Sequence, residues 1–392
     1  MIHEVIPALR LLLTMLAVTT VLTGCKTISD TYDGWFGSAP KQKPAELVQF
    51  QSQATLRIVW QANVGAAGRG GFYPSAVGNT VYAAGASGQI AGFAANTGAS
   101  QVRFEAATPL SGGLGTGVGL ILAGTARGEV LAFDLSGKPV WKTQLTGEVL
   151  SPPAAADGVV VVRTGDGRIY GLNAADGKQR WVYQRALPTL ALRSYAGVVV
   201  YRGGVFAGFP GGRLVAIALE TGNVGWEAVV ALPKGATELE RVTDVTSSPV
   251  VDGAQVCAVA FQGRVACFDA IRGETLWARD ASSIAGMGLD ARNAYVTDDR
   301  SAVQALDRGR GASLWKQDKL NGRRASAPLA MGRYVIVGDY QGYVHVLSRD
   351  DGAFVARIAT DGSAIQVPPL ALDLSTFLVQ TRNGGVFAIS IQ

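Results

Sequence analysis

The chain has 392 residues, of which 48% are hydrophobic and 17% are charged. This balance excludes an intrinsically disordered chain, which needs high charge and low hydrophobicity, and a coiled coil, which is rich in Glu, Lys and Leu. The net charge of +5 is small for this length and the basic residues are scattered, so no nucleic-acid-binding footprint is expected. Fifty glycines beside many runs of Val, Ile and Ala favour short strands joined by tight turns.

The N-terminal segment has the features of an export signal. Residues 11–22 are apolar apart from three threonines, a run too short for a comfortable bilayer span but typical of a signal-peptide core. It ends in Leu22-Thr23-Gly24-Cys25, which resembles the lipobox at which bacterial lipoproteins are cleaved and lipidated. We therefore expect residues 1–24 to be a signal peptide and Cys25 to carry the lipid. Lys26 favours sorting to the outer membrane, because an Asp there would resemble an inner-membrane retention signal.

A polar stretch follows the expected lipidation site. Residues 25–53 contain Gly37, Pro40 and Pro44 and show no periodic apolar pattern, so we expect a flexible, lipidated tether. The alternative for this end of the chain is an ordinary signal peptide followed by a chance cysteine.

From residue 54 onward one motif repeats eight times, at intervals of roughly 40 residues. Each copy has an apolar strand, a turn glycine, a second apolar strand, another glycine and a strand that usually carries a tryptophan. The turn positions are Gly88, Gly128, Gly167, Gly212, Gly263, Ser301, Gly342 and Gly384, and the tryptophans are Trp141, Trp181, Trp226, Trp277 and Trp315. Four-stranded units of this length are the signature of a β-propeller. The sequence therefore predicts an all-β, eight-bladed propeller of antiparallel blades over residues 54–392.

The two ends of the repeat region complement each other. The last unit stops at Gln392 before any tryptophan strand, whereas Leu56–Trp60 is a tryptophan strand with no unit before it. Pairing the two would complete the eighth blade and remove an open sheet edge. The tryptophans are expected to fill the wedge between neighbouring blades. A seven-bladed ring with stray terminal strands is the alternative.

The repeat, most complete from Gly263 to Trp277, resembles the PQQ-type propeller repeat. Two further segments narrow the resemblance, namely Leu187–Ser194 (LPTLALRS) and Thr237–Val245 (TELERVTDV). Together with the lipobox and the eight units, they make the whole mature chain similar to the BamB family, lipoprotein subunits of the outer-membrane β-barrel assembly (BAM) machinery. The resemblance implies a non-catalytic scaffold without a cofactor, anchored by lipid to the outer membrane and facing the periplasm.

The resemblance also implies a partner and a surface. In the BamB family the corresponding loops face the periplasmic region of BamA, the barrel-forming subunit, and unfolded outer-membrane protein chains are a further expected partner. Leu190, Leu192 and Arg193 match the family's contact segment, and Asp244 matches the first acidic residue of the second loop. Thr246 stands where the family can carry another acid, so the second loop departs from the family's charge pattern at that position.

The residues themselves point to the same surface. Both segments lie between a tryptophan strand and the next unit, and long loops on a rigid scaffold are common binding sites. Leu190-Ala191-Leu192 is an apolar run beside an arginine, which suits a protein interface. Arg193 could pair with Asp244, or either could meet a charge on a partner. The alternative is that both leucines pack under the loop.

Two other classes of function stay open. PQQ-type repeats also build quinoprotein dehydrogenases, which resemble this chain in the repeat but carry a vicinal Cys-Cys pair, a bound calcium and a catalytic Asp. This sequence has no vicinal cysteines and no acidic cluster with calcium-loop spacing, and His345 is expected to be a surface strand residue. The other class is a periplasmic propeller that binds a carbohydrate or peptide in its central funnel, for which Phe72, Tyr73 and Tyr195 are candidate lining residues.

Cys257 and Cys267 flank the turn of one expected hairpin. An oxidising compartment permits a disulfide, which forms only if the two residues lie opposite each other with Cα atoms within about 7 Å. A three-residue turn would place them so, and two buried thiols are the alternative.

Overall fold

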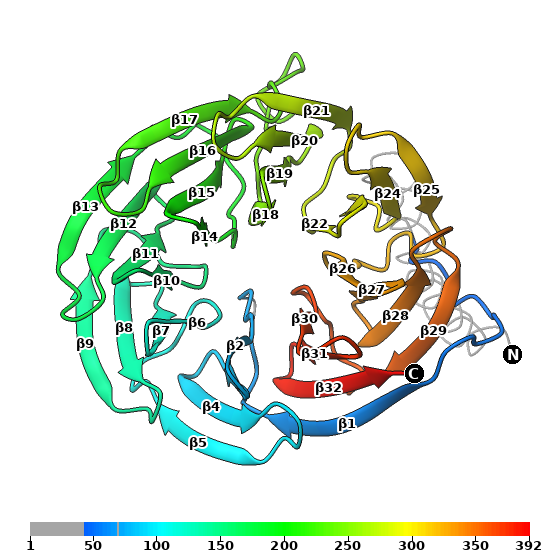
Figure 1. Cartoon of the computed structure of the whole chain (residues 1–392), viewed down its shortest axis with the longest axis horizontal. Coiled ribbons are helices and arrows are strands. Elements are labelled where there is room, and N and C mark those ends of the chain that lie inside the picture. Colours follow the sequence, from blue (N-terminus) through cyan, green and yellow to red (C-terminus); the bar gives the residue numbers. More distant parts are fainter. Residues whose placement is uncertain (1–42, 69) are drawn as a thin grey trace, which may run out of the picture. The chain divides into compact units, whose positions relative to one another are not determined.

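Thirty-two β-strands make up the regular structure of residues 43–68 and 70–392, which the computed structural model describes. They form eight separate four-stranded antiparallel sheets, and within the unit Ala45–Gln392 these sheets follow one another around a ring (Figure 1). The predicted eight-bladed propeller is confirmed. The expected signal peptide, Cys25 and most of the expected tether lie outside the described residues.

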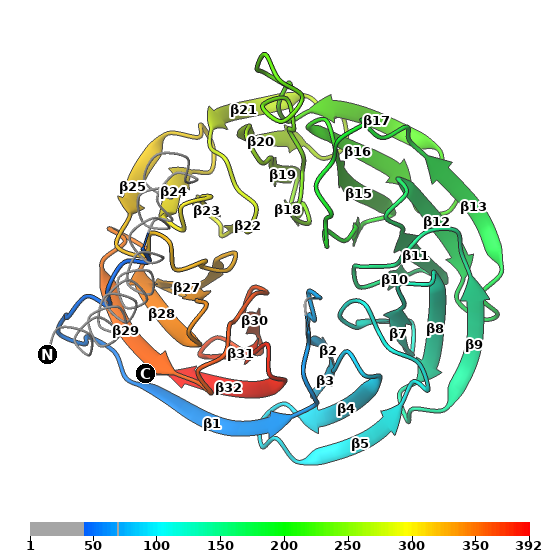
Figure 2. The ribbon, with the colours of Figure 1, turned by 180° about the vertical axis from the view of Figure 1, so that it is seen from behind.

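Seven blades are each built from four consecutive strands that run from the centre of the ring outward (Figures 1 and 2). Blades one to four are β2 (Ser75–Val77), β3 (Thr80–Ala84), β4 (Gln89–Ala94), β5 (Ser100–Glu105); β6 (Gly115–Gly117), β7 (Leu120–Gly124), β8 (Glu129–Asp134), β9 (Pro139–Gln144); β10 (Ala154–Ala156), β11 (Val159–Arg163), β12 (Arg168–Asn173), β13 (Gln179–Gln184); and β14 (Val199–Tyr201), β15 (Gly204–Phe209), β16 (Arg213–Ala218), β17 (Val224–Val229). Blades five to seven are β18 (Val250–Asp252), β19 (Gln255–Val259), β20 (Arg264–Asp269), β21 (Thr275–Asp280); β22 (Gly286–Leu289), β23 (Asn293–Thr297), β24 (Val303–Asp307), β25 (Ser313–Gln317); and β26 (Leu329–Met331), β27 (Tyr334–Gly338), β28 (Tyr343–Ser348), β29 (Phe354–Ala359).

The eighth blade joins the two ends of the ring. It contains β30 (Leu370–Ala371), β31 (Thr376–Gln380) and β32 (Gly385–Ile391), and its outermost strand is β1 (Leu56–Asn63) from the start of the propeller. β1 pairs antiparallel with β32, with Leu56 opposite Ile391 and Asn63 opposite Gly385. The predicted closure is therefore confirmed, and the seven-bladed alternative is wrong.

Burial follows the position of each strand within its blade. The second and third strands are buried along nearly their whole length, as in β11 and β12, because the neighbouring blades cover both faces of the sheet. The outermost strands are more open to solvent, as in β9, where exposed residues alternate with partly buried ones. A register shift interrupts the pairing of the third and fourth strands. In blade three it lies between Gly171 and Leu172, where a small residue of the third strand is followed by a large one. Such bulges increase the local twist, which suits a blade that must turn within a ring.

The tryptophans lie at the boundaries between blades. The indole nitrogen of Trp181 donates to the carbonyl of Leu219 in the next blade at 2.9 Å, and Trp60 donates to Ala95 at 2.7 Å, which fastens the closing blade to the first. The turn glycine beside each indole has no room for a side chain. At Gly222, which has a φ of +76°, an added Cβ would lie 2.7 Å from the Trp181 ring. The tryptophans therefore fill the wedge between blades, as expected.

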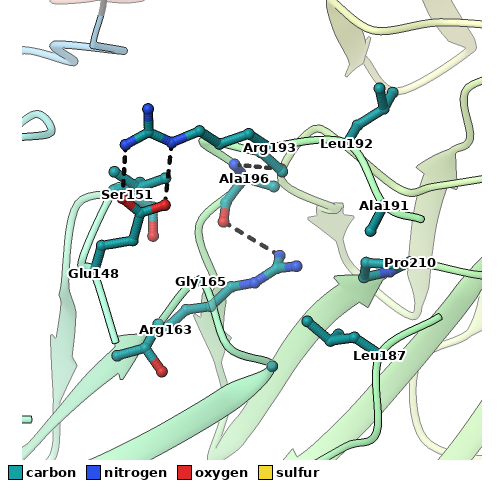
Figure 3. A pocket seen from close by; sticks show the side chains of 14 residues that line it. Glu148, Ser151, Arg163, Gly165, Leu187, Ala191, Leu192, Arg193, Ala196 and Pro210 are labelled. Carbon is teal, nitrogen blue, oxygen red and sulfur yellow. Dashed lines mark hydrogen bonds and ion pairs between the residues drawn. The ribbon is translucent and has the colours of Figure 1, made fainter. Parts of the chain in front are cut away.

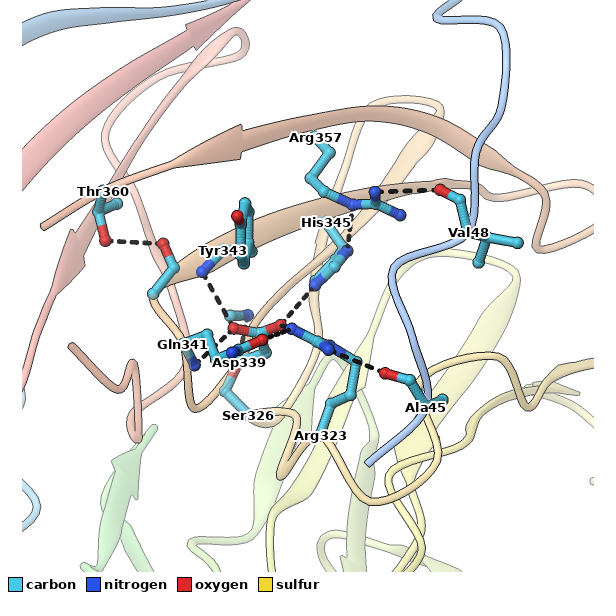
Figure 4. A network of polar contacts seen from close by, with 12 residues as sticks. Ala45, Val48, Arg323, Ser326, Asp339, Gln341, Tyr343, His345, Arg357 and Thr360 are labelled. Carbon is cyan, nitrogen blue, oxygen red and sulfur yellow. Dashed lines mark hydrogen bonds and ion pairs between the residues drawn. The ribbon is translucent and has the colours of Figure 1, made fainter. Parts of the chain in front are cut away.

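Blade seven contains a buried polar cluster, and the prediction that His345 is a surface residue is wrong. His345 on β28 is fully buried, and its Nε2 lies 2.9 Å from the Oδ2 of Asp339 (Figure 4). Arg323 also donates from Nε to Asp339 Oδ2 at 2.8 Å, and Arg357 donates from Nε to His345 Nδ1 at 3.1 Å. The histidine is therefore enclosed between a carboxylate and a guanidinium.

This cluster also holds a piece of the expected tether. We call Ala45–Gln53 the N-terminal strap. Its carbonyls accept hydrogen bonds from the two arginines of the cluster, Arg323 Nη1 to Ala45 at 2.9 Å and Arg357 Nη1 to Val48 at 3.1 Å (Figure 4). The strap thus lies along blade seven before the chain enters β1. The division of the chain at residues 24 and 53 stays a prediction.

Candidate partner-binding site

The two segments singled out in the sequence belong to the two longest connections between blades. Residues 185–198 join β13 to β14, and residues 230–249 join β17 to β18. In each blade the first and third strands run in one direction and the second and fourth in the other. The inter-blade connections therefore share one face of the ring with the turns between second and third strands. We call this the loop face.

Asp244 ties the two long connections together. It is 1% exposed, and its Oδ2 accepts a hydrogen bond from the backbone amide of Leu192 at 2.6 Å. Its Oδ1 accepts from the amide of Gly211 at 3.0 Å. Both carboxylate oxygens are therefore used inside the protein, one for each neighbouring loop, and the backbone of Asp244 also forms a bridge with Pro210.

The sequence of blade four explains why a distant carboxylate does this work. In blade seven the turn between the second and third strands begins with Asp339, whose Oδ1 accepts the amide of Tyr343 at 3.0 Å. In blade four the turn begins with Pro210, which has no side-chain acceptor. Asp244 from the following connection supplies the missing acceptor and thereby fixes its own loop against the turn.

A partly buried cation lies near this carboxylate. Arg163 at the end of β11 donates from Nη1 to the carbonyl of Ala196 at 3.2 Å (Figure 3). Its guanidinium also lies 5.2 Å from the centre of the Phe209 ring. Burial lowers the pKa of Arg163 to about 10, an effect that the nearby charge of Asp244 opposes. The guanidinium stays charged at neutral pH, so Asp244 has a positive charge beside it.

Arg193 pairs with Glu148 rather than with Asp244. Its Nε and Nη2 donate to the two carboxylate oxygens of Glu148 at 3.1 and 2.6 Å, a two-pronged contact that raises the pKa of the arginine (Figure 3). The Arg193 side chain nevertheless stays 60% exposed. Glu148 was not among the residues predicted from the sequence. It lies in the same kind of connection one unit earlier, between β9 and β10, and that position was the available signal.

The segment 187–195 forms a ridge among three hollows on the loop face. Leu190, which is 46% exposed, borders a hollow of about 160 Å³ shared with the second connection. Leu192 is partly buried and, with Arg193, borders both a small hollow above Arg163 and a wide one of about 530 Å³. The alternative that both leucines pack under the loop is therefore wrong for Leu190. We call Leu187–Tyr195 the contact ridge.

The second loop continues this arrangement at the position that lacks an acid. Thr246 is 9% exposed, and its carbonyl accepts a hydrogen bond from the Ser194 hydroxyl at 3.0 Å. Its own hydroxyl donates to the carbonyl of Ile284 at 3.4 Å. Thr246 therefore links the contact ridge to the connection after blade five through uncharged groups.

Two of the three funnel candidates reach an open hollow. Phe72 is 2% exposed and packs in the core, whereas Tyr73 and Tyr195 line the wide hollow on the loop face. Burial raises the pKa of Tyr73. Because Leu192 and Arg193 border the same hollow, the contact ridge and the centre of the ring are continuous.

Cys257 and Cys267 lie directly opposite each other on β19 and β20, with Cα atoms 4.1 Å apart, and the structure joins them in a disulfide. Both are fully buried between blades. Mass spectrometry with and without a reductant tests whether the bond forms in the protein.

Within residues 43–68 and 70–392, no group of three or more His, Cys, Asp or Glu side chains is placed to hold a metal ion. No helix in this part of the chain is long and apolar enough to cross a membrane.

Comparisons with known proteins identify the family. The family model described as outer membrane protein assembly factor BamB matches residues 86–317 and 300–392. A protein of that name from Nitrosomonas eutropha is 44% identical over 386 residues, which cover 96% of this chain and 94% of the relative. The crystal structure of BamB from Moraxella catarrhalis superposes with a TM-score of 0.79 at 25% identity, over 86% of this chain and all of that one.

A dehydrogenase shares the architecture and little else. Quinohemoprotein alcohol dehydrogenase from Comamonas testosteroni superposes with a TM-score of 0.69 over 86% of this chain and 76% of its own, at 11% identity. That likeness shows the fold alone. The near-full-length identity lies with the assembly factors, and the chain belongs to the outer membrane protein assembly factor BamB family.

Proposed function

We propose that the protein is a non-catalytic lipoprotein subunit of the BAM complex, which scaffolds BamA and assists the insertion of β-barrel proteins into the outer membrane. The observation that carries the proposal is the 44% identity with an outer membrane protein assembly factor over 96% of the chain. The name of its relatives, outer membrane protein assembly factor, supports an association with the outer membrane and with the machinery that assembles proteins there. A dehydrogenase role has no such support, because the likeness to those enzymes is one of fold.

BamA is the proposed partner of the contact ridge. An interface anchor needs exposed apolar surface beside a group that fixes orientation, and the ridge has exposed Leu190 next to partly buried Leu192 and an exposed guanidinium on Arg193. In this proposal Asp244 supports the ridge from inside the protein, because both of its carboxylate oxygens accept hydrogen bonds from backbone amides of the surrounding loops. It is a positioning residue rather than a contact.

Attachment of lipid at Cys25 and orientation toward the periplasm complete the proposal. The lipobox supports both. Even fully extended, the 20 residue steps from Cys25 to Ala45 reach at most roughly 70 Å. The lipid would therefore keep the ring near the membrane in which BamA sits, and the N-terminal strap would set blade seven as the point from which the tether starts.

The test is a binding measurement between the periplasmic region of BamA and the mature protein lacking Cys25. We expect Arg193→Ala to lose about 1–3 kcal/mol of binding free energy, a rise in Kd of about 5- to 150-fold, if the arginine is an anchor. Arg310→Ala is the matched control, since Arg310 pairs with Asp307 in a turn on the opposite face and is 83% exposed. No binding of the wild type would contradict the proposed function, and wild-type affinity in Arg193→Ala would contradict the site.

A second candidate function rests on the wide hollow. Tyr73 and Tyr195 line it beside Ile284 and Val367, a mixture of aromatic and aliphatic side chains that suits an extended peptide or a sugar. In this alternative Tyr73→Ala, which lies outside the contact ridge, loses ligand binding while BamA binding is unchanged. Equal binding of unfolded barrel segments and of sugars to the wild type and to Tyr73→Ala would contradict it.

A further inference from the structure

One leucine stands out on the loop face. Leu239 is 75% exposed, more than any other large hydrophobic side chain on that face in the described part of the chain. The two that exceed it, Ile271 and Leu374, lie in turns of the opposite face. Leu239 belongs to the connection between β17 and β18, which projects beyond the rim at the top of Figures 1 and 2.

The turn that carries Leu239 is folded by its own hydrogen bonds. Glu240 Oε2 accepts from the amides of Ala236 and Thr237 at 2.9 and 3.1 Å, and Thr237 Oγ1 accepts from the amide of Glu240 at 3.2 Å. This reciprocal pattern is a capping box, and its backbone donors lower the pKa of Glu240. Arg241 completes one helical turn by donating its amide to the carbonyl of Thr237 at 3.1 Å.

Two further contacts fix the turn in place. Gly235 has a φ of +129°, and a Cβ there would lie 2.3 Å from the Cβ of Glu240, so only glycine fits. Below the turn, the side-chain amide nitrogen of Gln262 donates to the carbonyls of Leu239 and Val242 at 3.2 and 2.9 Å, in the amide orientation that satisfies its neighbours. The turn is therefore prefolded although it is exposed, and a prefolded loop loses less conformational entropy on binding.

The turn also borders a hollow that belongs to the contact ridge. The hollow of about 160 Å³ lies between Pro188 and Leu190 of the ridge and Pro233, Arg241 and Val242 of the second connection. The apolar part of its lining comes from Pro188, Leu190, Pro233 and Val242, and the polar part from Glu238, Arg241, Thr243 and Asp244. The apolar part suits a single branched side chain. The exposed leucine and the hollow thus belong to one surface that continues the ridge.

We propose that Leu239 is a second anchor for the partner of the contact ridge, and that the adjoining hollow receives one apolar side chain from that same partner. This inference rests on the proposed function and adds to it a residue and a receiving site. The partner element that fits is a folded protein surface with an apolar recess for Leu239 beside a projecting aliphatic side chain. The four charged residues of 232–242 are two acids and two bases, so the turn lacks the basic cluster that attracts anionic lipid.

The test compares two leucines of similar exposure on opposite faces. In the mature protein lacking Cys25, Leu239→Ser should raise the Kd for the periplasmic region of BamA at least about 10-fold, whereas Leu374→Ser should leave it unchanged. Leu239→Met should retain most of the affinity, because it keeps the apolar volume. Gly235→Ala should weaken binding with Leu239 still present, since it disturbs the turn. Circular dichroism and the thermal midpoint check that each variant is folded.

The outcomes separate this inference from the proposed function. If Arg193→Ala weakens BamA binding and Leu239→Ser does not, the second anchor is wrong and the function stands. If the wild type does not bind BamA, the proposed function itself fails. If Leu239→Ser keeps wild-type BamA affinity but loses binding to vesicles of phosphatidylethanolamine and phosphatidylglycerol, the turn contacts lipid and the inference is overturned.

Discussion

Asp244 and Asp339 are two buried carboxylates on the loop face, and they serve different surroundings. Asp339 lies in blade seven among Arg323 and His345, and that cluster ends at the N-terminal strap, a part of the same chain. Asp244 lies beside Arg163, and the loops it holds end in the exposed side chains of the contact ridge. The same chemistry therefore completes the interior in one blade and supports an open surface in another.

Removing the carboxylate of blade seven should have the largest effect. Asp339→Ala leaves Arg323 buried without its counter-charge, and loss of one partner of a buried ion pair costs about 3–5 kcal/mol. We expect the free energy of unfolding, measured with denaturant, to fall by that amount while BamA affinity of the folded fraction stays the same. A change below about 1 kcal/mol would show that the cluster does not stabilise the fold.

The equivalent change on the ridge side should affect binding as well as stability. Asp244→Ala leaves the amides of Leu192 and Gly211 without their acceptor, at a cost of about 1–3 kcal/mol for each unsatisfied buried group that water does not reach. Because the ridge then loses its support, we expect the Kd for BamA to rise about 10-fold or more. Asp244→Asn keeps one acceptor oxygen, so its Kd for BamA should lie between those of the wild type and Asp244→Ala. Wild-type affinity in Asp244→Ala would contradict its positioning role.

A pH titration gives the smallest of these effects and separates the two clusters. Burial lowers the pKa of His345, although Asp339 opposes the shift, so the folded protein favours the neutral imidazole. Its contribution to stability is full above the unfolded pKa of about 6.5 and is lost as the pH falls below it. Burial also acts against the charge of Asp339, but hydrogen bonds from His345 and Arg323 outweigh it and lower the pKa of this carboxyl. Its contribution is lost only near pH 4 and below.

His345 is the only histidine after residue 24, so the measurement is clean. In the wild type, we expect the denaturant concentration at the unfolding midpoint to decrease as the pH is lowered from 7.5 to 5.5. In His345→Gln the decrease should be smaller. BamA binding should not follow this titration, because the ridge cluster has no histidine. Identical pH profiles of the two proteins would contradict the burial of His345.

The fold was predictable because its determinants recur along the chain. Glycine turns and tryptophans repeat at a regular spacing, which predicts eight blades. The strand Leu56–Trp60 has no unit before it, and the last unit has no tryptophan strand, so the pairing that closes the ring follows as well. The burial of His345 was open to prediction as well. The equivalent position in other blades, three residues after the turn glycine, is occupied by Ala91, Leu131 and Val215. All three are buried, because neighbouring blades cover both faces of the sheet.

The site was predictable only in part, because its contacts join residues from loops that do not repeat. The apolar run Leu190–Leu192 and the length of the second connection located the surface. Neither the pairing of Arg193 with Glu148 nor the burial of Asp244 could be derived from spacing, since both depend on how three separate connections meet over blades three to five. A proline at position 210 is the one local sign that an acceptor must come from elsewhere.

The central claim is that the contact ridge touches BamA directly. A photoreactive amino acid placed at position 190 in the lipidated, full-length protein in cells tests it, with position 374 on the opposite face as the control. Both side chains are exposed leucines, at 46% and 94%, so the probe should not disturb the core at either place. The account predicts a crosslink to BamA from position 190 and none from position 374. A crosslink from 374 alone, or from neither position while the BAM complex stays intact, would contradict it.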